Sequence, residues 1–128
     1  MKKIFYYTDV LPLLSEEGAA IKKLKDNLSI FKDSSGKVGL VWHPYPHTVK
    51  YMEINCSPVL DDYLRILDGY RTEGWGELDE SVLLEDEKAA LHDCDAYYGD
   101  MSDLVFEAQS LGMPVMLQNM DVLSERGE

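Results

Sequence analysis

Short runs of hydrophobic residues alternate along the chain with longer segments in which hydrophobic residues recur every three or four positions. Each short run is bounded by Gly, Pro or Asp, which is typical of buried strands. These runs are residues 4–7, 38–42, 75–78, 96–98 and 115–117. The longer segments have the spacing of amphipathic helices. The pattern therefore predicts five strands separated by helices.

The first two predicted helices have start and stop signals. Ser15 is the expected N-cap of the first helix. The second opens with Ser57 as N-cap and Pro58 after it, and Gly74 ends it. Segment 44–57, before this helix, is predicted to be the one irregular loop. The inward stripes are Ile21, Leu24, Leu28 and Phe31 in the first helix, and Val59, Tyr63, Ile66, Leu67 and Tyr70 in the second.

The last two predicted helices are shorter. The third runs from Ser81 to about Cys94. The fourth follows Asp100-Met-Ser-Asp103, a variant of the capping box, and ends at Gly112. The expected inward residues are Leu83, Leu84, Leu91 and Cys94 in the third helix, and Leu104, Val105, Ala108 and Leu111 in the fourth.

Strand–helix alternation of this kind predicts a parallel sheet, because βαβ units have right-handed crossovers that place helices on both faces. The expected fold is an α/β, Rossmann-like, three-layer α/β/α sandwich. Its five-stranded sheet is predicted to have the order 3-2-1-4-5. Residues 1–119 are expected to form a single domain, and residues 120–128 a short polar C-terminal tail.

The charge of the chain limits its partners. The 128 residues carry a net charge of −12, and 45% of them are hydrophobic. Nucleic acid and anionic membranes are poor partners for such a surface. No apolar run approaches the ~18 residues of a membrane span, and no signal peptide is recognised. Cys56 and Cys94 have no metal or redox spacing, so we expect a cytoplasmic protein with reduced thiols, no resident cofactor and no metal.

Candidate chemistry lies where the predicted strands end, because open α/β sheets bind ligands beyond the carboxyl ends of their strands. After the fourth strand come Gly99 and the segment Asp100, Met101, Ser102 and Asp103. A strand, a Gly and a helix start place backbone amides and a hydroxyl where a phosphate can bind. The alternative is that Asp100 and Ser102 only cap the helix.

The spacing downstream of this segment has a counterpart in known transferases. Glu107-Ala108, Gly112 and Pro114-Val115 form the pattern E-A-x-x-x-G-x-P-V. It resembles the donor-nucleotide segment of GT-B glycosyltransferases. That resemblance implies that Glu107 holds the ribose hydroxyls, for which a carboxylate is suited, and that Asp100–Asp103 hold the diphosphate. The alternative for Glu107 is a solvated helix residue.

A closer resemblance covers most of the chain. Residues 41–46 read V-W-H-P-Y-P, and residues 94–103 read C-D-A-Y-Y-G-D-M-S-D, followed by G-M-P-V-M-L-Q-N at 112–119. These runs, with G-W-G at 74–76 leading into Asp79, resemble the W-R-P-H-P and D-x-S-S elements of CDP-glycerol glycerophosphotransferase-like proteins. The resemblance implies the nucleotide-binding C-terminal half of a bacterial cell-envelope transferase, which moves glycerol phosphate from CDP onto a polyol chain.

The departures from that family concern its functional residues. His43 stands where the family has Arg, Tyr45 where it has His, and Asp103 where it has the second Ser. The first GT-B domain has no counterpart in 128 residues. We therefore expect a half-domain that binds a CDP-type nucleotide diphosphate and is not catalytic alone. The alternative is a non-catalytic protein-interaction module that forms a homodimer or pairs with a partner supplying the missing N-terminal domain.

The loop after the second strand carries the remaining candidates. His43 and His47 are candidates for a general base or a metal pair, although no third ligand has a fitting spacing, and loop or packing roles are the alternative. Tyr45 and His43 are possible nucleotide contacts of this loop. Aromatic residues here, among them Trp42 and Tyr51, either stack a base or pack in the core.

Acidic residues at the strand ends give a further alternative. A carboxylate cluster at this edge of the sheet would suit Mg²⁺. The simpler interpretation is a set of separately solvated loop acids. The residues concerned are Asp9, Asp79, Glu80 and Asp100.

Overall fold

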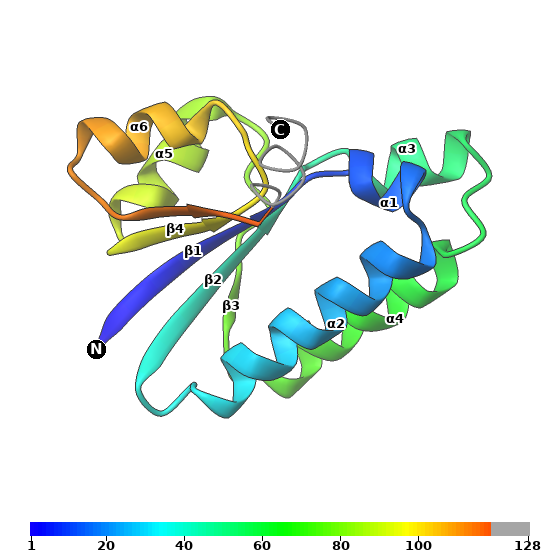
Figure 1. Cartoon of the computed structure of the whole chain (residues 1–128), viewed down its shortest axis with the longest axis horizontal. Helices are drawn as coiled ribbons and strands as arrows, with labels where there is room; N and C mark the ends of the chain where they lie inside the picture. Colours follow the sequence, from blue (N-terminus) through cyan, green and yellow to red (C-terminus); the bar gives the residue numbers. More distant parts are fainter. Residues whose placement is uncertain (119–128) are drawn as a thin grey trace, which may run out of the picture.

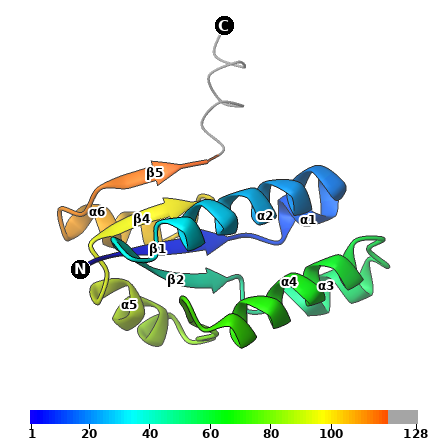
Figure 2. The same cartoon turned by 90° about the horizontal axis from the view of Figure 1, so that it is seen from below.

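The chain forms a five-stranded parallel sheet with helices on both faces in the computed structural model, which describes residues 1–118. The strand order is β3-β2-β1-β4-β5, as predicted; Figure 2 shows β5, β4, β1 and β2 side by side. Asn119 and the predicted tail at 120–128 lie outside the described residues. The elements are β1 (Lys2–Thr8), α1 (Leu11–Ser15), α2 (Gly18–Asp33), β2 (Val38–Pro44), α3 (Thr48–Ile54), α4 (Leu60–Glu73), β3 (Glu77–Leu78), α5 (Leu84–His92), β4 (Ala96–Gly99), α6 (Leu104–Ser110) and β5 (Val115–Leu117).

The central strand β1 contributes to two core layers, because successive side chains of a strand point to opposite faces. Tyr6 packs with residues of α1 to α4 on one face. Phe5 and Tyr7 pack with residues of α5 and α6 on the other face. Figure 1 shows α5 and α6 on one side of the sheet and α2 and α4 on the opposite side. The predicted three-layer arrangement is confirmed.

The larger layer is built around Trp42, which is fully buried. Its ring meets those of Tyr63 and Tyr70 edge-on, and its indole N–H donates to Thr8 Oγ1 at 3.0 Å. The predicted stripes of α2 and α4 face this layer. Gly74 ends α4 with a φ of +68°, a left-handed conformation that favours Gly. No helix within residues 1–118 is long and apolar enough to cross a membrane.

The segment 44–57 is not one irregular loop, contrary to the prediction. It contains α3, whose Met52 is fully buried against the larger layer. Before the helix, the Thr48 hydroxyl donates to the carbonyl oxygen of Tyr45 at 2.6 Å and fixes the turn. The helix has only seven residues, and its buried positions Thr48 and Met52 are one helical turn apart. So short a stripe is a weak sequence signal.

Both predicted N-caps are displaced. Ser15 ends α1 and donates to the carbonyl oxygen of Leu11 at 3.0 Å, while α2 begins only at Gly18. Pro12 favours a separate helical turn because its fixed φ suits a first turn. Ser57 accepts a hydrogen bond from the amide of Val59 at 3.3 Å, and α4 starts after that residue. Local hydrogen bonds of these serines therefore stabilise turns before the helices.

Three leucines predicted to be inward are exposed. Leu83 and Leu84 expose 66% and 50% of their surface, because α5 begins only at Leu84, near the edge where the strands end. Leu111 exposes 44% as the residue that caps the end of α6. Leu91 and Cys94 are buried as expected. The third strand is also shorter than predicted, with two residues instead of four.

Candidate functional site

The carboxyl ends of β1, β2 and β4 meet around a groove. β1 pairs with β2 on one side and with β4 on the other, so the direction in which strands are added reverses between β1 and β4. Two adjoining hollows of about 530 and 260 Å³ lie at this edge. We call them together the carboxyl-edge groove; both are lined by Tyr7, Tyr45, Ser102 and Asp103. Such a crevice is where open α/β sheets bind ligands.

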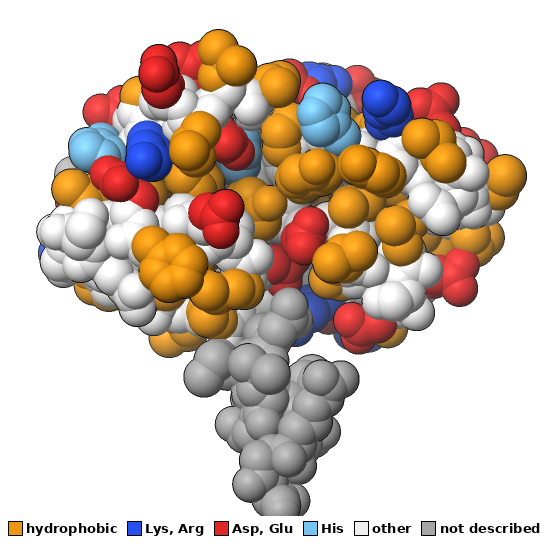
Figure 3. All heavy atoms as spheres, turned by 90° about the horizontal axis from the view of Figure 1, so that it is seen from above, with side chains coloured by type: hydrophobic (Ala, Val, Ile, Leu, Met, Phe, Trp, Pro, Cys, Tyr) orange, Lys and Arg blue, Asp and Glu red, His pale blue; other side chains and the backbone are white. Residues whose placement is uncertain are grey.

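Figure 3 looks onto this side of the molecule and shows hydrophobic side chains on both sides of a hollow, with acidic side chains in and beside it. One wall includes Leu11 and Tyr51 from the α1–α3 side, and the opposite wall includes Met101. These three side chains expose 64%, 41% and 49% of their surface. The groove therefore combines an acidic interior with an apolar rim.

The loop between β4 and α6 is held in place by Gly99 and Asp100. Gly99 has a φ of +132°, and a Cβ on it would lie 2.0 Å from the carbonyl oxygen of Tyr7, so the close approach of β1 and β4 requires Gly here. The buried Asp100 carboxylate accepts from the amide of Asp9 at 2.7 Å and from Gln118 Nε2 at 2.6 Å. Asp100 thus connects the ends of β1, β4 and β5.

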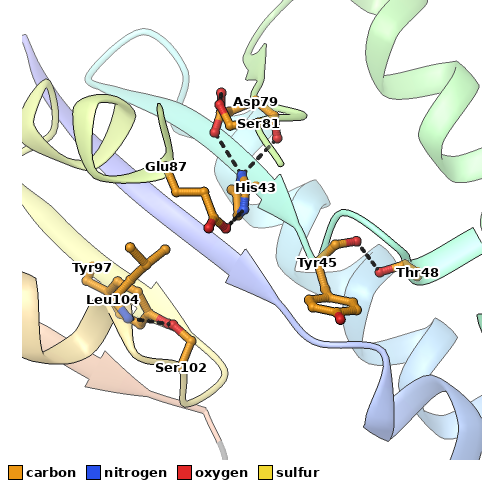
Figure 4. Close-up of polar contacts among 9 residues, drawn as sticks. All are labelled: His43, Tyr45, Thr48, Asp79, Ser81, Glu87, Tyr97, Ser102 and Leu104. Atoms are coloured by element: carbon orange, nitrogen blue, oxygen red, sulfur yellow. Dashed lines mark hydrogen bonds and ion pairs between the residues drawn. The ribbon is translucent and has the colours of Figure 1, made fainter. Parts of the chain in front are cut away.

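Ser102 and Asp103 follow in the same loop and reach the groove. The Ser102 hydroxyl lies 2.9 Å from the Tyr97 hydroxyl and accepts from the amide of Leu104 at 3.3 Å (Figure 4). Asp103 is the residue before α6, and its side chain makes no capping hydrogen bond. The structure therefore brings Met101, Ser102 and Asp103 to the groove. The buried Asp100 holds the loop in place through its hydrogen bonds to Asp9 and Gln118.

The charge in the groove is negative. Asp9, Asp103 and Glu87 line it, and no Lys or Arg among residues 1–118 lines either hollow. Partial burial raises the pKa of Asp9, and the negative charge of Asp100 raises it further. Negative charges that line the same groove repel a further negative charge, so the groove disfavours binding of an anion.

Aromatic rings form part of the groove wall. The rings of Tyr45 and Tyr51 lie 6.1 Å apart with their planes 32° from each other, and His47 packs edge-on against Tyr45 at 5.8 Å. Tyr45 and Tyr51 line the larger hollow, and Tyr45 and His47 the smaller one. Partly exposed aromatic faces of this kind can stack a planar ring. Trp42, in contrast, packs in the core.

His43 is fully buried and has no access to the groove. Its Nδ1 lies 2.8 Å from Asp79 Oδ2 and 3.0 Å from the Asp79 carbonyl oxygen, and its Nε2 lies 2.7 Å from Glu87 Oε2 (Figure 4). The ring also stacks against those of Phe5 and Tyr7, with ring centroids 5.5 and 5.7 Å apart. We call His43, Asp79 and Glu87 the histidine clamp, because it ties β2 to α5 and to the loop after β3.

Both ring nitrogens of His43 have a carboxylate partner, and the Asp79 carbonyl oxygen also faces Nδ1. His43 therefore packs and pairs as a structural residue. The sequence did not indicate Asp79 and Glu87 as its partners; the acidic first turn of α5, which includes Glu87, was the only local signal.

The structure separates other residues that the sequence placed together. His43 is buried while His47 is exposed on the groove, and no three His, Cys, Asp or Glu side chains within the described part of the chain could hold a metal ion. The four carboxylates considered for Mg²⁺ divide in the same way. Asp9 and Asp100 lie together, Asp79 belongs to the clamp, and Glu80 pairs with Arg71.

Glu107 is directed toward α5. Its carboxylate lies 2.6 Å from His92 Nε2 and 3.7 Å from Lys88 Nζ. The hydrogen bond from His92 is the main cause of its lowered pKa, to which the charge of Lys88 adds. Glu107 does not line either hollow of the groove. Its contact with a ribose stays a prediction, and such a contact would have to replace these two partners.

No family model matches the chain, and no curated protein or solved structure matches it either. The resemblance to CDP-glycerol glycerophosphotransferase-like proteins thus stays an expectation from the sequence.

Proposed function

We propose that this chain is a nucleotide-binding module that takes a CDP-type nucleotide in the carboxyl-edge groove and does not catalyse group transfer by itself. The observation that carries the proposal is the position of the groove. It lies over β1 and β4, where the strand order reverses, and its larger hollow has a volume of about 530 Å³. Crevices at such switch points are the usual nucleotide sites of open α/β sheets.

The two walls of the groove suit different parts of a nucleotide. Tyr45 and Tyr51 offer ring faces to the base on one wall. Met101, Ser102 and Asp103 supply a hydroxyl and backbone amides toward the phosphates on the other wall. The carboxylates of Asp9 and Asp103 oppose the phosphates, since no described cation of the groove offsets them. The base and sugar therefore contribute most of the binding, and the affinity is low.

The residues at the end of β2 support the proposal that the chain does not catalyse group transfer by itself. His43 is enclosed in the clamp with both ring nitrogens engaged, so it has no free nitrogen to offer as a base. The family that the chain resembles has an Arg and a His where this chain has His43 and Tyr45. Losing a single transition-state contact costs roughly 3 kcal/mol, and here two are replaced. We expect no turnover of CDP-glycerol with a glycerol-phosphate acceptor above the buffer blank.

Titration calorimetry with CDP, CMP and cytidine tests the proposal. We expect cytidine and CMP to bind about as well as CDP, because the second phosphate meets the acidic groove. Asp103→Ser should tighten CDP binding about three- to fivefold by removing one like charge, which is worth about 1 kcal/mol. The matched control Asp61→Ser removes an exposed charge at the start of α4 and should leave affinity unchanged. CDP that binds neither wild type nor Asp103→Ser at millimolar concentration would refute nucleotide binding.

A second candidate function is an interaction module whose groove receives a protein partner. The observation that favours it is the apolar rim of the groove, to which Val82 and Leu84 also belong. Leu11, Val82 and Leu84 expose 64%, 57% and 50% of their surface beside the groove. Contiguous exposed apolar residues often mark interaction sites. A partner protein with a complementary apolar surface would cover this rim. Protection of the rim from hydrogen exchange by a partner, with no protection by nucleotide, would favour this function over the first.

A further inference from the structure

β5 forms one edge of the sheet, and its outer side is open within the described residues. Pro114 accepts a hydrogen bond from the amide of Tyr97, and the amide of Gln118 donates to Gly99, both at 2.9 Å. Backbone groups alternate sides along a strand, so Val115 and Leu117 turn their N–H and C=O groups away from β4. Within residues 1–118, no strand pairs with this side of β5.

The two edges of the sheet differ in charge. β3, at the opposite edge, has Glu77 in an ion pair with Lys3 at 3.1 Å and is followed by Asp79 and Glu80. Charged side chains on an edge strand discourage pairing with another chain. From Ala108 to Met120, by contrast, the sequence has no Asp, Glu, Lys or Arg. This is the longest uncharged run in a chain of net charge −12.

Apolar side chains accompany the open edge. Met116 exposes 67% of its surface, while its neighbours Val115 and Leu117 pack against the α5–α6 layer on the opposite face of the sheet. On that same face, Phe106 of α6 and Leu111 after the helix expose 61% and 44%. Figure 2 shows β5 at the edge of the sheet with α6 beside it. The edge therefore offers both backbone hydrogen bonds and apolar contact.

We infer that β5 pairs antiparallel with β5 of a second copy of this chain, about a two-fold axis that passes beside Met116. In this register Val115 lies opposite Leu117 of the second copy, and both residues present their N–H and C=O groups to each other. Met116 then faces Met116 of the second copy in a non-hydrogen-bonded pair, in which the side chains come closest. The product is a continuous ten-stranded sheet.

Charge favours a second copy at this edge over other contacts between copies. Two chains of the same negative charge repel wherever their acidic surfaces meet, and they repel least where an uncharged run meets the same run. Salt screens the remaining repulsion, so the association should strengthen as salt is raised. A three-residue strand gives a small contact, so we expect a dimer that forms at micromolar to millimolar concentration. The carboxyl-edge groove stays accessible, and the inference does not depend on nucleotide binding.

Sedimentation equilibrium of charge variants at position 116 tests the two-fold register. Met116→Lys and Met116→Glu each place two like charges opposite one another, and each should weaken the dimer about tenfold or more. An equimolar mixture of the two variants places Lys opposite Glu and should restore the dimer. The control Ile30→Lys makes the same charge change at an exposed position of α2 and should leave the dimer constant as in wild type.

Hydrogen exchange of the full chain identifies what occupies the edge. If a second copy does, protection of the Val115 and Leu117 amides rises with protein concentration. Protection that does not change with concentration indicates a segment of the same chain and overturns the inference. So does a wild-type monomer at high protein concentration in both 0.05 and 0.5 M salt, or a mixture of the Lys and Glu variants that associates no better than either alone.

Discussion

The histidine clamp and the carboxyl-edge groove lie at the same end of the sheet, yet they behave as opposites. In the clamp, His43 is fully buried and both ring nitrogens have carboxylate partners. In the groove, Asp103 makes no capping hydrogen bond, and the faces of Tyr45 and Tyr51 are partly open. Residues at a strand end are therefore not equally accessible.

Strand alternation explains the difference. His43 belongs to β2 and points to the same face as Val41, where α5 covers the sheet and supplies Glu87. Tyr45 follows the end of β2, where no helix covers it completely. Two residues of chain thus separate a structural histidine from a residue of the groove. Variants of each region should affect different properties.

The largest effect is expected at the clamp. His43→Leu leaves the carboxylates of Asp79 and Glu87 without their shared partner in a largely buried site. Removing one partner of a buried pair costs about 3–5 kcal/mol, so the free energy of unfolding measured with urea should fall by about that amount. His47→Leu, at an exposed position of the groove, is the control and should cost less than about 0.5 kcal/mol. A His43→Leu protein as stable as wild type would show that the clamp does not support the fold.

The next effect is expected at Gly99, where β4 lies close to β1. Gly99→Ala introduces a Cβ that would meet the Tyr7 carbonyl oxygen at 2.0 Å, at a φ of +132°. We expect a loss of about 2–3 kcal/mol in the free energy of unfolding, from backbone strain and a displaced loop. Gly36→Ala is the control, because a Cβ there meets no atom within 4 Å. Equal urea midpoints for the two variants would contradict the close approach of β1 and β4.

A smaller effect of opposite sign is expected in the groove. The pKa of Asp9 is raised by burial and by Asp100, so its ionised form costs stability above the folded-state pKa, and that cost disappears as the pH falls below its unfolded value. Asp9→Asn should therefore stabilise the protein at pH 7, by less than about 1 kcal/mol because the carboxyl is partly solvated, and not at pH 3. Thermal unfolding at both pH values measures this. A stabilisation independent of pH would point to a cause other than charge.

The smallest effect is expected in the reactivity of the two thiols, of which Cys94 lies on the same face of the sheet as His43. Cys94 is buried in the α5–α6 layer and burial raises its pKa to about 12, whereas Cys56 is exposed. A chromogenic disulfide reagent at pH 8 should titrate one thiol of the native protein and two after unfolding, because the thiolate is the reactive form. In His43→Leu the second thiol should react faster. Rapid reaction of both thiols in the wild type would contradict this packing.

The periodicity of the chain was sufficient for the sheet and for most of the core. Runs such as 4–7 and 38–42 are too apolar for a solvated face, and the intervening stripes predict helical crossovers, so a parallel sheet could be predicted. The strand order 3-2-1-4-5 is confirmed, although the periodicity by itself does not fix it. Short elements could not be predicted in this way. α3 and β3 contain too few residues to show a period. α5 also begins later than its hydrophobic residues suggest, and Val82 and Leu84 line the groove. Exposed leucines have the same sequence signal as buried ones.

Sequence alone determined which residues are at the carboxyl edge, since that follows from where each strand ends. It brought Asp9, Tyr45, Ser102 and Asp103 to one side of the sheet, and the groove contains them. Only the tertiary structure decided which neighbours they meet. His43 is paired because α5 and the loop after β3 both deliver a carboxylate to it, and Glu107 faces His92 because α5 and α6 lie side by side. Contacts between elements distant in sequence have no local pattern, because they depend on how the helices pack on the sheet.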